Sequence, residues 1–133
     1  MDKKELIIKL LKEKGLLPKV DDDGDIVFRY QMKDVFVTTN DEDDKYVTVA
    51  LAHFYNIREE DVPIALTVCN KLTREMKIMK VFADNTLEYV SASCEFFYTN
   101  EDSLEYNLNY SLRILGFVYS LFKKNMKELS NGL

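Results

Sequence analysis

The sequence has few of the residues that mark unusual classes of protein. It contains no tryptophan, one histidine, two cysteines, two prolines and four glycines among 133 residues. Disorder is excluded because glycine and proline are scarce, whereas eight tyrosines and eight phenylalanines can fill a core. No apolar run approaches the roughly 20 residues that cross a bilayer. We therefore expect one soluble globular domain over residues 1–133, long enough to bury a core without disulfides.

The two cysteines and the N-terminal segment favour a cytoplasmic protein. Cys69 and Cys94 have no C-x-x-C spacing and lie in apolar patterns, which is typical of reduced, buried thiols. The apolar residues near the N-terminus are interrupted by Lys9, Lys12 and Lys14, so this segment lacks the continuous apolar stretch of a secretory signal. Reduced thiols are typical of the cytosol, and we expect the protein there.

The net charge of −5 arises from two short acidic clusters. These clusters contain eight carboxylates, more than the net charge of −5 requires, so the rest of the chain carries a slight positive charge. Because lysine and arginine form no clustered stripe, binding to the phosphate backbone of a nucleic acid is not expected. The clusters consist of Asp21, Asp22, Asp23 and Asp25, and of Asp41, Glu42, Asp43 and Asp44.

Hydrophobic periodicity predicts an α+β fold with the order α-β-β-β-α-β-β-α. Apolar residues recur at helical spacing in three segments and alternate with polar residues in five others. The helices are expected over 2–14, over 59–74, and from a cap at Asn100 or Asp102 to about 129. The strands are expected over 26–31, 35–39, 46–54, 78–82 and 87–97. Short polar connections between these strands predict an antiparallel sheet of about five strands with flanking helices.

Alternation within the strands assigns one face of the sheet to the core. The apolar positions are Ile26, Phe28, Tyr30, Val35, Val37, Val47, Val49, Leu51, Val90, Ala92, Cys94 and Phe96. We expect the helices to cover this face. The opposite positions are small or polar, among them Thr48, Ala50, Ser91 and Ser93, so we expect that face to contact water.

Neither acidic cluster matches a metal-binding motif. When Gly24 is aligned with the sixth position of an EF-hand loop, Lys19 and Tyr30 occupy the first and twelfth positions, so two essential carboxylates are missing. The simpler interpretation is a hydrated turn in which Gly24 adopts a positive φ. Consecutive carboxylates at 41–44 diverge from one loop and do not converge on two ions. A small-ligand or divalent-cation sensor that uses the acidic loops is the alternative function.

No residue pattern indicates catalysis or a cofactor. His53 is the single histidine and lies in an alternating strand, so it forms no metal site alone, and no recognisable motif pairs it with a nucleophile. The scattered glycines Gly15, Gly24, Gly116 and Gly132 form neither a P-loop nor a G-x-G-x-x-G motif. We therefore expect no enzyme activity, no catalytic or metal-binding residues and no cofactor.

The last predicted helix is the best candidate for a binding surface. Its apolar residues form two stripes that together cover a wide arc of the helix surface. A single sheet can cover only one of these stripes. The first stripe contains Leu104, Leu108, Leu112, Leu115, Tyr119, Phe122 and Met126, and the second contains Tyr110, Ile114, Phe117 and Leu121. The second stripe is covered either by the other helices or by a partner. We predict that Tyr110, Ile114, Phe117 and Leu121 bind a partner protein.

The element order and two segments resemble the YbjN family of bacterial sensory transduction regulators. The first segment is DDGDIVFRYQ at 22–31, and the second is the helix-to-strand junction NKLTREMKIMKV at 70–81. This family is similar in fold to type III secretion chaperones. The resemblance implies a helix-flanked antiparallel sheet that pairs into dimers, with no established enzyme activity and no site residues to carry over.

These observations predict a non-enzymatic protein-interaction module. We expect it to be a homodimer that acts as a chaperone-like protein or as a regulatory adaptor. The expected partners are a second copy of the chain and another polypeptide. Neither a nucleic acid nor a membrane is expected as a partner.

Overall fold

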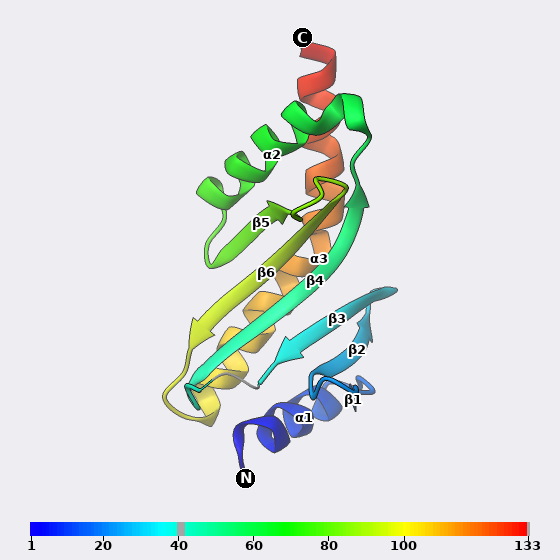
Figure 1. The fold of residues 1–133 in the computed structure, drawn as a ribbon. Coiled ribbons are helices and arrows are strands. Elements are labelled where there is room, and N and C mark those ends of the chain that lie inside the picture. The colour runs from blue at the N-terminus through cyan, green and yellow to red at the C-terminus, as the bar shows by residue number, and fades with distance from the viewer. Residues whose placement is uncertain (40–41, 133) are drawn as a thin grey trace.

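The computed structural model of the protein describes residues 1–39 and 42–132, which form one antiparallel sheet of six strands and three α-helices. The strand order across the sheet is β1-β2-β3-β4-β6-β5 (Figure 1). The helices are α1 (Lys3–Glu13), α2 (Val62–Glu75) and α3 (Glu101–Gly132), and a single 3₁₀ turn, η1 (Glu59–Asp61), precedes α2. The strands are β1 (Lys19–Val20), β2 (Ile26–Tyr30), β3 (Lys33–Thr38), β4 (Tyr46–Asn56), β5 (Met79–Ala83) and β6 (Tyr89–Phe97). The predicted α+β class and element order are confirmed, with six strands instead of five.

The additional strand, β1, consists of two exposed residues, too few for an alternating pattern to be recognised in a sequence. It pairs antiparallel with β2, and the first acidic cluster forms the turn between them. Asp21 Oδ1 accepts hydrogen bonds from the backbone N–H groups of Asp23 (3.0 Å) and Asp25 (2.9 Å). Gly24 has a φ of 85°, so the positive φ predicted for this glycine is confirmed.

Local signals determine where the helices begin. The carboxylate of Asp2 caps α1 by accepting a hydrogen bond from a backbone N–H in its first turn. Pro63 lies in the first turn of α2, and the segment predicted as one helix over 59–74 is a 3₁₀ turn followed by an α-helix. At the start of α3, Asn100 Oδ1 accepts a hydrogen bond from the N–H of Ser103 at 2.8 Å, as the predicted cap requires.

The last helix, α3, covers one face of the sheet. In Figure 1, α3 lies behind β4 and β6 and runs along them, while α2 packs against β5 and α3. Every position that the sequence assigns to the core face is buried, except Tyr30, which is half-buried. Ser91 and Ser93, on the opposite face, are also buried, which corrects the expectation that they contact water. Their short side chains lie beside the longer Phe82 and Lys80, their cross-strand partners on β5.

The turn between β2 and β3 approaches α3 closely. Gln31 and Met32 form this turn, and their φ angles of 50° and 66° are those that a two-residue hairpin requires. Gly116 of α3 faces the turn. A Cβ atom at Gly116 would lie 2.8 Å from Gln31 Oε1 and 3.4 Å from the ring of Tyr30. A side chain at this position would displace the end of the Gln31 side chain and press against the Tyr30 ring.

Candidate functional site

The side of α3 that faces the sheet belongs to the core. Leu104, Leu108, Leu115 and Phe122 are almost completely inaccessible to solvent. An α-helix repeats every 3.6 residues, so these four positions lie on one side of the helix and the residues between them face elsewhere. The first predicted stripe is therefore buried, except for Tyr119, which is half-buried.

One flank of α3 faces α2. Ile114 is 5% exposed and Leu121 is half-buried against the core, and Asn125 continues the same flank one turn further on. Lys71 of α2 donates a hydrogen bond from Nζ to Asn125 Oδ1 at 2.6 Å, which identifies α2 as the element on this flank. Of the four residues predicted to bind a partner, Ile114 and Leu121 are thus covered largely within the chain.

The other two predicted residues lie on the side of α3 that faces away from the sheet. Phe117 is 49% exposed, and Tyr110 is half-buried with the guanidinium carbon of Arg113 5.5 Å from its ring centroid. Tyr106, one turn before Tyr110, is 69% exposed. We call Tyr106, Tyr110 and Phe117 the outer stripe. Tyr106 was not among the predicted residues, although its spacing of four residues from Tyr110 places both on the same side of a helix.

The face of the sheet opposite α3 carries a second group of exposed aromatic residues and a polar network. Phe82 is 44% exposed and Phe97 is 64% exposed. Glu95 accepts hydrogen bonds from the Tyr46 hydroxyl and from Lys80 Nζ, the latter at 2.7 Å. Burial raises the pKa of Glu95, but the hydrogen bonds from Lys80 and Tyr46 outweigh burial and hold that pKa below its ordinary value. In this network the Lys80 ammonium group balances the charge of the Glu95 carboxylate. Phe82 and Phe97 remain exposed on the same face of the sheet.

The acidic clusters do not form a metal centre among the residues that the structure describes. Asp21 uses its carboxylate to hold the turn between β1 and β2, and Lys3 donates a hydrogen bond to the backbone oxygen of Asp43 at 2.9 Å. Asp41 lies outside the described residues. Across residues 1–39 and 42–132, no group of three or more histidine, cysteine, aspartate or glutamate side chains is arranged to hold a metal ion. The divalent-cation alternative has no structural observation in its favour.

Neither cysteine is placed as a nucleophile. Burial raises the pKa of the Cys69 thiol to about 11. It also raises the pKa of the Cys94 thiol to about 12, although a hydrogen bond with Ser111 lowers it slightly. Both thiols are therefore protonated near neutral pH, whereas a nucleophilic cysteine reacts as the thiolate.

Comparison with known proteins identifies the fold. No family model and no curated relative matches the sequence. Two solved structures are similar over most of their length. YbjN from E. coli, a putative transcription regulator, has a TM-score of 0.70 at 10% identity, covering 93% of this chain and 92% of that chain. An uncharacterized protein from Methanothermobacter thermautotrophicus has a TM-score of 0.61 at 15% identity, covering 93% and 99%.

The chain therefore has a YbjN-like fold, which confirms the fold that the sequence resemblance implied. At 10% and 15% identity these likenesses establish the arrangement of elements and nothing about partners, because one fold serves many functions. The similarity to type III secretion chaperones stays a prediction. No helix among the described residues is long and apolar enough to cross a membrane.

Proposed function

We propose that this protein is a non-enzymatic interaction module that forms homodimers through the outer stripe of α3. The observation that carries the proposal is the exposure of Tyr106 and Phe117, with Tyr110 between them, on the side of α3 away from the sheet. The exposed side of a helix in a two-layer fold is ordinarily polar. Aromatic residues and arginine are the residue types that contribute most of the binding energy in protein interfaces.

The outer stripe is complementary to a second copy of itself. When two antiparallel helices are related by a twofold axis, each residue of one helix faces a residue of the other, and the two residue numbers of every facing pair add up to the same total. The position of the axis along the helix fixes that total. With the axis between residues 111 and 112, Tyr106 of one copy faces Phe117 of the other, and Tyr110 faces Arg113. The first contact joins two exposed aromatic rings. The second pairs an arginine with a tyrosine, the cation–π contact that already exists within one chain at 5.5 Å.

The non-enzymatic part of the proposal is supported by the buried, protonated thiols of Cys69 and Cys94 and by the single histidine. The same module would act as a regulatory adaptor or a chaperone-like protein, with another polypeptide as a further partner. Nucleic acid is not a proposed partner because the net charge is −5. A membrane is not proposed either, and the free cysteines support a cytoplasmic location.

The experiment compares the molar mass of the wild-type protein and of Phe117→Asp by light scattering at tens of micromolar. We expect the wild type to be a dimer. A carboxylate in an apolar contact should raise the dissociation constant at least about thirtyfold, the effect of losing roughly 2 kcal/mol at a hot spot. Circular dichroism would confirm that the variant keeps its fold.

Phe97→Asp is the matched control, because it introduces the same charge at an exposed phenylalanine on the opposite side of the molecule. It should remain a dimer. A monomeric wild type would refute homodimerisation. If Phe97→Asp dissociated while Phe117→Asp did not, the interface would be the sheet face and the assignment to α3 would be wrong.

A further inference from the structure

Asp102 and Lys124 lie on the same side of α3 as the outer stripe. Asp102 precedes Tyr106 by four residues, about one turn of the helix, and Lys124 follows Tyr106 by 18 residues, which is about five complete turns. Both side chains are exposed. The outer stripe therefore has a carboxylate at one end and an ammonium group at the other.

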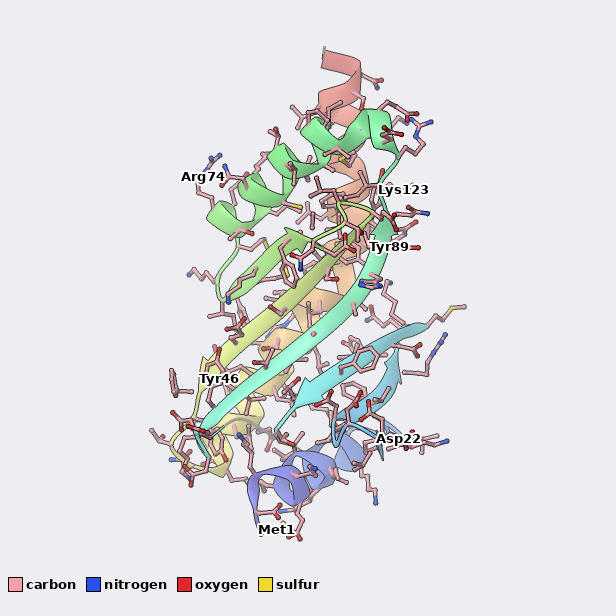
Figure 2. All side chains as sticks on the ribbon, in the orientation of Figure 1. Met1, Asp22, Tyr46, Arg74, Tyr89 and Lys123 are labelled. Atoms are coloured by element: carbon pink, nitrogen blue, oxygen red, sulfur yellow. The ribbon has the colours of Figure 1, made fainter. Side chains whose placement is uncertain are left out.

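Neither charge has a partner of opposite sign within its own chain. In the part of the chain that the structure describes, no ion pair includes Asp102 or Lys124. The two residues are separated by about 33 Å along a straight helix, so they cannot meet within one copy. In Figure 2, Lys123, the neighbour of Lys124 in the sequence, lies in the part of α3 beside α2, well away from the first turn of the helix.

A second copy of α3 in the antiparallel orientation brings these opposite charges together. In the register in which Tyr106 faces Phe117, the numbers of Asp102 and Lys124 add up to three more than the total for facing pairs. This difference corresponds to an offset of about 4.5 Å along the axis, which the four-carbon stem of a lysine spans. Because the axis is twofold, the same ion pair forms once at each end of the contact.

The same charges oppose the alternative arrangements of two helices. In a parallel pair, Asp102, Arg113 and Lys124 would each face the identical residue of the other copy, so three pairs of like charges would be brought together. If the antiparallel helices slid until Asp102 faced Lys124 directly, Arg113 would face Arg113. Contacts between like charges are a common means by which interfaces reject wrong partners and wrong registers.

We infer that Asp102 and Lys124 form two symmetric ion pairs between copies of the chain and determine the antiparallel orientation and the register of the dimer. This inference rests on the proposed homodimer and adds the residues that make its interface specific for a second copy. The aromatic side chains of the outer stripe supply most of the binding energy, because each exposed ion pair contributes little by itself.

The test is a set of charge reversals in the full-length protein, with dissociation constants measured by sedimentation equilibrium at about 0.01 M and about 0.5 M salt. Lys124→Glu and Asp102→Lys each convert both ion pairs into pairs of like charge. We expect each variant to raise the dissociation constant about tenfold at the lower salt concentration. The effect should shrink at the higher concentration, where exposed charges are screened.

Two combinations of these variants should restore the dimer. The double variant, with Asp102→Lys and Lys124→Glu in one chain, again has opposite charges across the interface and should dimerise about as tightly as wild type. An equimolar mixture of the two single variants should also recover dimers. In a mixed dimer, one contact joins the two substituted residues and the other joins the two native ones, so both contacts are attractive.

Lys123→Glu and Glu105→Lys are the matched controls. Both residues are exposed, and each substitution changes the net charge by the same amount as the reversal that it matches. Each control residue is adjacent in sequence to a residue of the outer side and is rotated from it by about 100° around the helix. The controls should change the dissociation constant less than about twofold. Circular dichroism would confirm that every variant keeps its fold.

The outcomes separate this inference from the proposed dimer. A monomeric wild type would refute both. If the wild type is a dimer but the two reversals weaken it no more than their controls do, the proposed dimer stands and the ion pairs are overturned. The ion pairs are also overturned if the double variant dissociates as readily as the single variants.

Discussion

Glu95 is stabilised as a carboxylate by its neighbours on the exposed face of the sheet. Lys80 and Tyr46 lower its pKa in the folded protein more than burial raises it. A carboxylate with a lowered folded-state pKa contributes stability at neutral pH, and this contribution disappears as the pH falls from the unfolded value of about 4.3 through the folded one. Glu95→Gln removes the charge but keeps a polar group in the same place.

We expect Glu95→Gln to lower the free energy of unfolding by about 1 kcal/mol at pH 7, and the difference from wild type to shrink below about pH 4. Urea unfolding at pH 7, 5 and 3.5 measures both effects. Glu88→Gln is the control, because Glu88 is exposed just before β6 and forms no ion pair with a described residue. Equal stability of Glu95→Gln and wild type at pH 7 would contradict the expected role.

The two cysteines should be unreactive in the folded protein. With pKa values of about 11 and 12, Cys69 and Cys94 carry very little thiolate at pH 8, and both are buried. We expect iodoacetamide to modify them at least about a hundred times more slowly in the native protein than in urea. Thr86→Cys, in the exposed turn before β6, is the positive control and should react at once. Rapid native-state labelling of either wild-type cysteine would disprove the prediction.

Among the elements, β5 is the edge of the sheet, and α2 protects it. The Thr73 hydroxyl of α2 accepts a hydrogen bond from the N–H of Val81 at 2.8 Å and donates to its carbonyl oxygen at 3.1 Å. These backbone groups would otherwise be free to pair with another strand, and unpaired edges promote association between chains. The helix α2 therefore satisfies the outward-facing backbone groups of Val81 in the middle of this edge.

Thr73→Val tests this role, because valine has nearly the same shape but neither donates nor accepts a hydrogen bond. We expect a loss of about 1 kcal/mol in the free energy of unfolding and faster hydrogen exchange at the Val81 amide. Thr73→Ser should retain most of the stability, since it keeps the hydroxyl. If the valine variant were as stable as wild type and Val81 exchanged equally slowly, Thr73 would have no protective role.

The elements that the sequence predicted correctly are those with long periodic patterns. Alternation over residues 26–31, 46–54 and 87–97 identified both the strands and their buried face, and helical spacing identified all three helices. β1 escaped prediction because two residues cannot display a period. β4 extends two residues beyond the predicted 46–54, past a bulge between Leu51 and Tyr55.

For the whole molecule, the candidate surfaces depended on packing between elements that are distant in the sequence. Wide apolar coverage of the last helix was evident from its spacing alone, but the contact of α2 with one flank was not. Ile114 is buried within the chain, whereas Phe117 and Tyr110 lie on the outer stripe beside Tyr106.

Local chemistry was sufficient to specify the α+β order, the cap of α3 at Asn100, the glycine turn at Gly24 and the inward face of each long strand. These features depend on interactions within a few residues, and such interactions leave a readable pattern in a single chain. The choice of which apolar flank is covered emerged only when the sheet and helices packed together. Packing couples residues far apart in the chain, so no local pattern records it.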